Sequence, residues 1–457
     1  MQKYYDMVEK YKDLILKAER RIWENPEPGY KEFKTNEFML KTFEELGYTD
    51  IVRPKDITGF YTVVDTGRPG PTVLVLAELD SLINFKHPEC DKETGAVHNC
   101  GHHVQCAVML GLAAVLKEEG ALDGLSGKIK LCVVPAEEGI EVGYRKGLIK
   151  DGVIKYATGK PEFISRRFFD DVDLAFMLHT AAATKPEDEK VLFSLTKGHN
   201  GNIRKKTTVI GKSAHAGAHP EDGINALNAA SLIIVAINSL RETFTESDFA
   251  RVHSIITKGG DAVNAVPNEV VIESYIRAAN PIVNKSVNDK VNRAISATAA
   301  SIGCRVKIED IAGSEALNED ANLREVALEV FEELVGKDAY IYHDKWMASS
   351  TDMGDISTLF PSIHAYVGGA YGTSHGIDYY IKNPYLACVN GAKFEFGLLR
   401  KLLENDAVRA KDIISKFTPV FNSIDDYLAH KFSINMEKET VIYNEDGTIT
   451  LDYKNKI

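Results

Sequence analysis

The chain has 457 residues, more than one ordinary hydrophobic core holds, which predicts two domains or one large domain with an insertion. Hydrophobic residues make up 44% and charged residues 26%, the average of globular proteins, so we expect the whole chain to fold. The formal net charge of −12 argues against nucleic acid and anionic membranes as partners, because both select clustered Lys and Arg. A small-molecule partner is expected instead.

The first 22 residues carry apolar side chains at helical spacing with charges between them, which predicts one amphipathic helix and not a signal peptide. The longest apolar stretches, 107–116 and 232–237, have the length of core helices and are too short to cross a membrane. The six cysteines show no close pairing pattern, which fits a reducing compartment. We therefore expect a cytoplasmic protein.

Residues 59–185 alternate between short apolar runs and helical patterns, which is typical of an α/β domain. A helix is expected over 104–117. Buried strands are expected over 59–65, 72–79, 128–134 and 173–178.

A second pattern then follows, whose order is strand, helix, strand, strand, helix, strand, as in ferredoxin-like (βαββαβ) domains. Its elements are expected at 202–210, 222–241, 251–258, 268–277, 281–301 and 303–310. The first pattern resumes after Gly313, with a helix at 320–335, a strand at 363–367 and helical patterns over 384–404, before a hairpin within 440–453. We expect an α/β domain over 1–198 and 314–457, the latter with a C-terminal hairpin extension, and an inserted domain over 199–313.

Several possible metal ligands lie where the helix near residue 104 begins, because residues 98–103 read His-Asn-Cys-Gly-His-His. Cys100 and His102, two residues apart, can face one cation, and a helix N-terminus favours the thiolate. In the alternative interpretation, Cys100 is an ordinary buried thiol and the histidines are a solvated cap.

Further candidate ligands follow other predicted strands. Glu137 and Glu138 come after the strand at 128–134, His179 after the one at 173–178, and His375 after the one at 363–367. A Glu pair in a solvated loop or a structural His would be the ordinary interpretation of each alone. Four such positions at the ends of strands are better explained by one shared site, because ligands bind at that edge of α/β sheets.

These residues belong to a series of blocks, which are residues 21–47, 77–80, 98–102, 135–139, His179, 213–216, 264–267 and 351–355. The series resembles the amidohydrolase branch of the aminoacylase and carboxypeptidase G metallopeptidase superfamily. The branch members most similar to the chain are the aminobenzoyl-glutamate hydrolases and, less so, the indoleacetyl-amino-acid hydrolases. The resemblance implies a metal-dependent exopeptidase-like catalytic domain with an inserted lid domain that also dimerises.

The resemblance implies a dinuclear site in which Cys100 bridges two divalent cations and His102, Glu138, His179 and His375 complete the ligands. Glu137 would be the general base. Zn²⁺ suits this Cys-containing set best, and Mn²⁺ or Co²⁺ would also fit the imidazole and carboxylate donors.

The resemblance also implies roles for residues that hold the site and the substrate. Asp80 would orient the ligands, and His215 would polarise the scissile carbonyl, reaching across a homodimer formed through the lid. Asn264 and Arg277 would bind the substrate, with Arg277 suited to grip a free carboxylate.

The function implied is hydrolysis of an amide bond in an N-acyl amino acid, an aminobenzoyl-glutamate-like compound or a small peptide, by water that the metal activates and Glu137 deprotonates. Two alternatives are a catalytically inactive binding relative and a hydrolase that uses Cys100 as a nucleophile with His102 as its base. Loss of activity on removal of metal would distinguish the dinuclear enzyme from the thiol enzyme.

The chain departs from related sequences at two positions and carries a long segment before Asp173. His103 stands where many relatives have Asp or Asn. It could compete as a ligand or cap the helix, and we favour the cap. Glu78 replaces a common Asp and is expected to alter packing more than chemistry. The segment 156–171, which includes Arg166 and Arg167, could line the entrance of the site or form a solvated loop, and we favour the loop.

Overall fold

The computed structural model describes residues 1–455, which fall into two compact units. The first unit contains residues 1–197, 318–345 and 355–420, and the second contains residues 198–317, 346–354 and those from 421 onward. Among the described residues, no helix combines the length and the apolar character needed to span a membrane.

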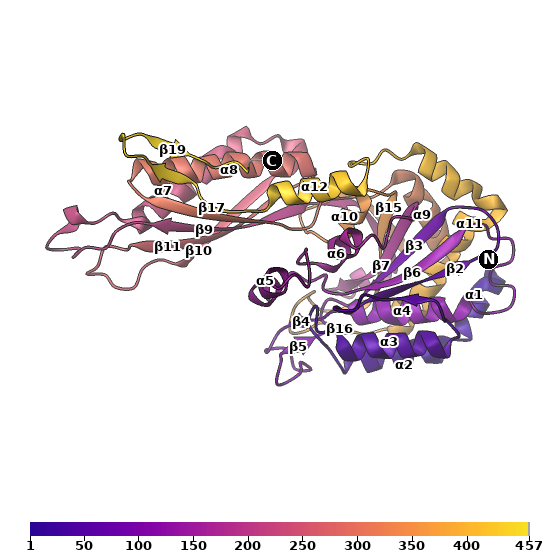
Figure 1. The fold of residues 1–457 in the computed structure, drawn as a ribbon. Helices are drawn as coiled ribbons and strands as arrows, with labels where there is room; N and C mark the ends of the chain where they lie inside the picture. Colours follow the sequence, from indigo (N-terminus) through magenta and orange to yellow (C-terminus); the bar gives the residue numbers. More distant parts are fainter. Residues whose placement is uncertain (456–457) are drawn as a thin grey trace. The chain divides into compact units, whose positions relative to one another are not determined.

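The first unit is built on a mixed β-sheet, which confirms the expected α/β class (Figure 1). Its centre consists of four parallel strands in the order β6 (Lys128–Val134), β3 (Thr72–Glu78), β7 (Leu174–Ala183) and β15 (Ser362–Tyr371). Most of these residues are buried, which explains why apolar side chains predominate in the four strands. The remaining strands are β1 (Ile51–Val52), β2 (Phe60–Asp65), β8 (Phe193–His199), β13 (Leu317–Asn318), β14 (Tyr340–Met347) and β16 (Tyr380–Ile381).

Helices cover this sheet and complete one apolar core. All residues of α4 (His102–Val115) are buried, as its almost entirely apolar sequence requires. The expected single N-terminal helix is instead two helices, because a turn at Lys10 and Tyr11 lets α1 (Gln2–Glu9) and α2 (Lys12–Trp23) each bury an apolar face. The other helices are α3 (Phe33–Glu45), α5 (Val142–Lys150), α6 (Gly159–Ser165), α9 (Ala321–Val335), α10 (Met353–Ser357) and α11 (Gly391–Lys416).

The second unit contains the predicted βαββαβ order, with β9 (Gly201–Ile210), α7 (Ala226–Ser239), β10 (Arg251–Lys258), β11 (Glu269–Ala278), α8 (Pro281–Ser301) and β12 (Arg305–Ala312). Together with β17 (Met436–Glu439), these strands form an antiparallel sheet in the order β10-β11-β9-β12-β17. Each helix starts at an Asn whose side chain accepts backbone N–H groups, Asn225 for α7 and Asn280 for α8.

The C-terminal segment differs from the expected domain boundaries. It was expected in the α/β domain but belongs to the second unit, where β17 (Met436–Glu439) pairs antiparallel with β12. This pairing satisfies backbone groups that β12 would otherwise expose at a sheet edge. The expected hairpin is present as β18 (Val441–Tyr443) and β19 (Ile449–Leu451), which follow α12 (Ile424–Ile434) and β17.

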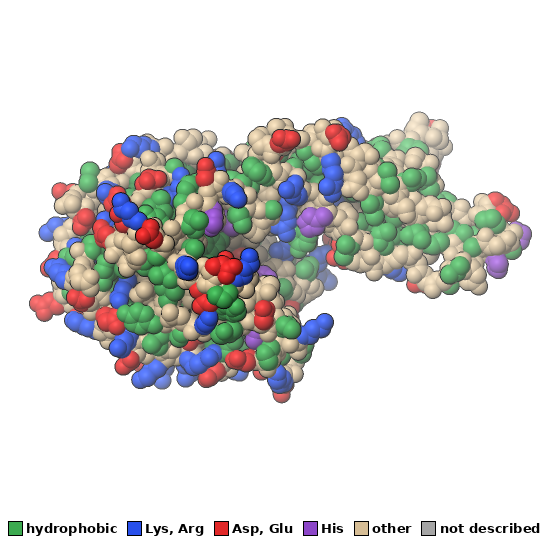
Figure 2. Space-filling model, turned by 180° about the vertical axis from the view of Figure 1, so that it is seen from behind, with side chains coloured by type: hydrophobic (Ala, Val, Ile, Leu, Met, Phe, Trp, Pro, Cys, Tyr) green, Lys and Arg blue, Asp and Glu red, His purple; other side chains and the backbone are tan. Residues whose placement is uncertain are grey.

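The face of the molecule shown in Figure 2 carries both acidic and basic side chains.

Candidate metal centre

The candidate ligands of the first unit gather at the C-terminal edge of its parallel strands. Glu137 and Glu138 follow β6, and His375 follows β15, as the sequence predicted. His179 lies within β7 and not after it, because this strand continues to Ala183. The edge is the one at which α/β proteins build their sites.

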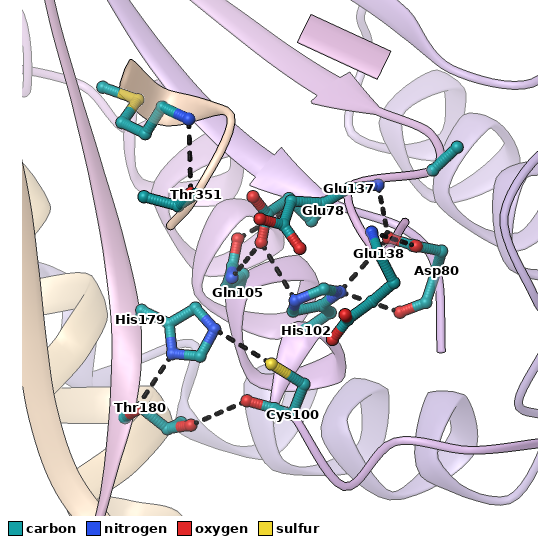
Figure 3. Close-up of polar contacts among 12 residues, drawn as sticks. Glu78, Asp80, Cys100, His102, Gln105, Glu137, Glu138, His179, Thr180 and Thr351 are labelled. Carbon is teal, nitrogen blue, oxygen red and sulfur yellow. Dashed lines mark hydrogen bonds and ion pairs between the residues drawn. The ribbon is translucent and has the colours of Figure 1, made fainter. Parts of the chain in front are cut away.

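Cys100 reaches this edge through a tight turn at the start of α4. Gly101 has a φ of 99°, and a Cβ atom there would lie 2.1 Å from Thr180 Oγ1, so only glycine fits. The Thr180 hydroxyl donates to the Cys100 carbonyl at 3.3 Å. The Cys100 Sγ then lies 3.5 Å from His179 Nε2 (Figure 3).

Asp80 fixes both the His102 ring and the Glu137–Glu138 turn. Its carboxylate accepts the backbone N–H of Glu137 at 3.1 Å and that of Glu138 at 2.9 Å. His102 Nδ1 is 3.2 Å from Asp80 Oδ1 and 2.9 Å from the Asp80 carbonyl oxygen. Because Nδ1 is committed to Asp80, Nε2 is the nitrogen of His102 that can bind a cation.

His375 is held by hydrogen bonds between its own loop and the loop that contains Asn99. Its backbone N–H donates to the Asn99 carbonyl at 2.8 Å, and the Asn99 side chain donates to the Gly376 carbonyl at 3.0 Å. The ring is half-exposed, and its Nε2 lies 3.6 Å from Glu138 Oε1. Residues far apart in the sequence therefore converge on one side of the site.

The five expected ligands lie close enough to hold cations. Ligand atoms within 4.8 Å of one another occur in the group Cys100, His102 and His179 and in the group Cys100, Glu138 and His375. Cys100 belongs to both groups, which is the arrangement that a bridging thiolate requires. Glu138 Oε1 and His102 Nε2 are buried and make no hydrogen bond to the described residues, so the donor set fits metal binding.

The charges of the site also favour a cation. Burial raises the pKa of Cys100 well above its ordinary value, and nearby Glu138 adds to this effect. Burial likewise raises the pKa of Glu138. Burial lowers the pKa of His179 to about 4, so this ring is a neutral imidazole, the form that binds metals. A divalent cation would offset the cost of burying the two anions.

Two departures from related sequences have consequences that differ from those expected. His103 does not cap α4; it is buried beside Trp23, and its Nε2 lies 3.3 Å from Glu19 Oε1. Glu78 was expected to affect mainly packing. It instead lies inside the polar network, with Oε2 at 3.1 Å from His102 Nε2 and 2.7 Å from Gln105 Nε2 (Figure 3).

The segment 156–171 contradicts its interpretation as a solvated loop. It contains α6, whose residues Gly159–Ile164 are all buried, and the Lys160 ammonium forms an ion pair with Glu78. Lys160 and Gln105 were missed as residues of the site. The apolar side chains of Phe163, Ile164 and Phe169 were the available signal that this segment packs inside.

The remaining predicted site residues belong to the second unit. His215 is exposed, and its Nδ1 accepts the N–H of Gly217 at 3.2 Å and that of Ala218 at 3.0 Å, so its proton resides on Nε2. Asn264 lies beside it, because the Asn264 carbonyl accepts the N–H of Ala216 at 3.0 Å.

Arg277 is half-buried on β11, where its guanidinium donates to Ser350 Oγ at 2.7 Å. Arg277 lies near the end of β11, eight residues after Glu269, the first residue of this strand. His215 lies near the start of β11, because its bridge partner Ala265 precedes Glu269 in the chain. At ~3.3 Å per residue, the strand alone separates these two ends by roughly 26 Å. The structure therefore brings His215 and Asn264 together and places Arg277 at the other end of the sheet.

The fold and the cluster of donor atoms place the chain in the class of two-unit α/β proteins that have a candidate centre for two metal ions at the edge of the sheet. The chain belongs to peptidase family M20/M25/M40, whose model matches residues 74–401. This membership confirms the resemblance inferred from the sequence.

Similar proteins include hydrolases of amino-acid conjugates. The chain is 27% identical to IAA-amino acid hydrolase ILR1-like 5 of Arabidopsis thaliana over 66% of its own length and 65% of the relative's. It is 26% identical to ILR1-like 2 of the same plant, over 83% and 84%. It is 29% identical to a p-aminobenzoyl-glutamate hydrolase chain of Escherichia coli (strain K12), over 55% and 54%. The match thus spans just under two thirds of the first relative and about half of the third.

Solved structures show the same fold. A putative aminohydrolase from methicillin-resistant Staphylococcus aureus superposes with a TM-score of 0.70 at 21% identity, over 88% of this chain and 100% of the other. The YXEP protein of Bacillus subtilis, described as a dinuclear metal-binding peptidase of the M20 family, superposes with a TM-score of 0.66 at 17% identity, over 88% and 99%.

Proposed function

We propose that this protein is a dinuclear metal-dependent amidohydrolase that cleaves an N-acyl amino acid, an aminobenzoyl-glutamate-like compound or a small peptide. The observation that carries the proposal is that Cys100 is shared by two groups of ligand atoms at the sheet edge. Membership of a peptidase family and similarity to hydrolases of amino-acid conjugates support the same reaction class. Zn²⁺ is the proposed metal, because Cys and His donors suit it, and Mn²⁺ or Co²⁺ would also fit.

Two divalent cations would acidify a water molecule and polarise the scissile carbonyl. Glu137 takes the proton from this water and later delivers it to the leaving nitrogen, so that the products are a carboxylic acid and an amine. Its neighbour Glu138 is a ligand, and Asp80 holds both residues through their backbone N–H groups. The N–H on His215 Nε2 is available to donate to the developing oxyanion.

A homodimer through the second unit is part of the proposal. Asn264 and Arg277 bind the substrate, and Arg277 pairs with its free carboxylate. His215 and Asn264 lie together at one end of the sheet and Arg277 lies at the other, so one subunit cannot apply all three to the same small substrate. We therefore assign His215 and Asn264 to the substrate of the partner subunit. Exposed apolar side chains on α7 and β10, such as Val235 (60% exposed) and Ile255 (63% exposed), would be covered by the second copy.

The cytoplasm is the proposed location. All six cysteines are free thiols, which suits a reducing compartment.

The test combines metal analysis of the purified protein with a mass-spectrometric screen of N-acyl amino acids, aminobenzoyl-glutamate and dipeptides. We expect two divalent cations per chain, hydrolysis of at least one substrate class, loss of turnover after chelation and recovery on addition of metal. The Glu137→Gln protein is the matched control for contaminating activity. Turnover that survives complete removal of metal would favour the thiol alternative, and bound metal without turnover on any class would favour a binding relative.

A further inference from the structure

The ion pair between Lys160 and Glu78 lies directly behind His102. Both side chains are almost completely buried, and Lys160 is brought there by α6. Gly159, the first residue of this helix, packs so closely that a Cβ atom would lie 1.8 Å from the Pro135 carbonyl oxygen. Helix α6 is therefore fixed against the end of β6, the strand that leads into Glu137 and Glu138.

Glu78 has the position and the chemistry of a metal ligand. Its Oε2 lies 3.1 Å from His102 Nε2, the nitrogen that can bind a cation, and this contact lacks hydrogen-bond geometry. Two ligands on one cation are separated by about this distance, since each bond to the metal is roughly 2.0 to 2.2 Å long. A small rotation of the Glu78 carboxylate would bring an anionic oxygen to the cation that His102 faces.

Two donors hold Glu78 away from this role. Gln105 Nε2 donates to Oε2 at 2.7 Å, and the Lys160 ammonium binds Oε1. A carboxylate paired with an ammonium in the interior has its charge already compensated, so its attraction to a nearby cation is reduced. Ligand atoms of Glu78 and Glu137 lie within 4.8 Å of one another, but Glu78 is absent from the groups that contain Cys100 or His102.

We propose that Lys160 is a positioning residue of the metal centre, which engages Glu78 and so keeps this carboxylate from becoming an additional ligand of the cation at His102. The inference rests on the proposed function. It gives the segment 156–171 a specific task, since the helix of this segment delivers the ammonium.

The test compares Co²⁺ binding by the metal-free wild-type, Lys160→Met and Lys160→Met/Glu78→Gln proteins, using visible absorption and competition with a chromophoric chelator. In Lys160→Met, the released Glu78 should bind Co²⁺, lowering its visible absorption by raising the coordination number, and tighten binding roughly tenfold through its uncompensated charge. Turnover should fall. The double variant has no carboxylate to release, so its spectrum, affinity and turnover should return toward wild type.

A merely structural role for Lys160 would change thermal stability without changing the Co²⁺ spectrum, and an unchanged spectrum and affinity in Lys160→Met would overturn the proposal. The same substitution at an exposed lysine, Lys150→Met, is the control for replacing a lysine with methionine away from the site. If Lys160→Met does not fold, the double variant still decides, because loss of its His102 cation would show that Glu78 is already a ligand in the wild type. Failure of the wild-type protein to bind any cation would instead refute the proposed function.

Discussion

The replacement Asp80→Asn tests how the site is held together. The Asp80 carboxylate receives the backbone N–H groups of Glu137 and Glu138 and contacts His102 Nδ1. An asparagine of the same shape has one acceptor oxygen. If this oxygen takes the place of Oδ1, it keeps the hydrogen bonds to Glu137 and His102. The amide nitrogen then takes the place of Oδ2 and faces the backbone N–H of Glu138, so the hydrogen bond to Glu138 is lost.

The expected loss follows from this one bond. A hydrogen bond to a charged group contributes about 1.5 to 3 kcal/mol, which corresponds to roughly 10- to 150-fold in affinity at 1.4 kcal/mol per tenfold. His102 keeps the Asp80 carbonyl oxygen at 2.9 Å as a partner, so its ring should stay in place. The weakened cation should therefore be the one at Cys100, Glu138 and His375, and the protein should retain one cation when free metal is limiting.

Metal affinity and stoichiometry are measured by competition with a chromophoric chelator, with circular dichroism to verify the fold. Exposed Asp50→Asn provides the same chemical change away from the site. Retention of both cations with affinities within about threefold of wild type, far less than one lost charge-assisted bond predicts, would refute the role assigned to Asp80.

Four further outcomes are expected. Cys100→Ser should fold but bind both cations more weakly, by several kcal/mol, because the thiolate belongs to both groups of ligands; unchanged stoichiometry and activity would contradict the bridge. Glu137→Gln should keep its metal while kcat falls by about 10² to 10⁴, whereas Glu138→Gln should lose a cation and recover partly in excess metal; the opposite pattern would exchange their roles. Arg277→Ala should weaken binding of substrates with a free carboxylate by about 2 kcal/mol. This value is the lower end of the range for buried ion pairs, because the Arg277 side chain is half-buried. An equal loss on amidated substrates would show that Arg277 has a structural role only. Burial raises the pKa of Glu319 to about 8, so the folded state holds a proton that the unfolded state releases above pH ~4.5. The free energy of unfolding should therefore fall as the pH rises from about 5 to 8. Urea unfolding of Glu319→Gln should show a shallower pH dependence than wild type, and an unchanged dependence would refute the assignment.

Elements with strong local signals were predictable from the sequence. Strand β6 occupies the expected residues 128–134, because apolar residues predominate in a strand that is buried between two others, here β2 and β3. Helix α8 matches the expected 281–301, since Asn280 caps it and Pro281 fits its first turn. The C-terminal segment was misplaced because the pairing of β17 with β12 depends on contacts more than 120 residues apart, as between Lys307 and Glu437.

The candidate ligands converge as expected, because parallel strands direct the residues at their C-terminal ends to one edge of the sheet. The role of Lys160 could not be predicted in the same way. Its partner Glu78 is 82 residues earlier in the chain, and a buried ion pair leaves no periodic signal in either segment. Glycine at position 159 allows the close approach, but the sequence alone does not show which carbonyl it approaches.

The sheet of the second unit has two unlike edges, and this difference would limit how copies of the chain assemble in the proposed homodimer. One edge is β10, eight residues long and with exposed isoleucines, and the other is β17, whose four residues read Met-Glu-Lys-Glu. A sheet with two long receptive edges could add copies at both and grow into an open filament. A short, charged edge on one side discourages such growth, so association through β10 in the proposed homodimer would end with a closed pair.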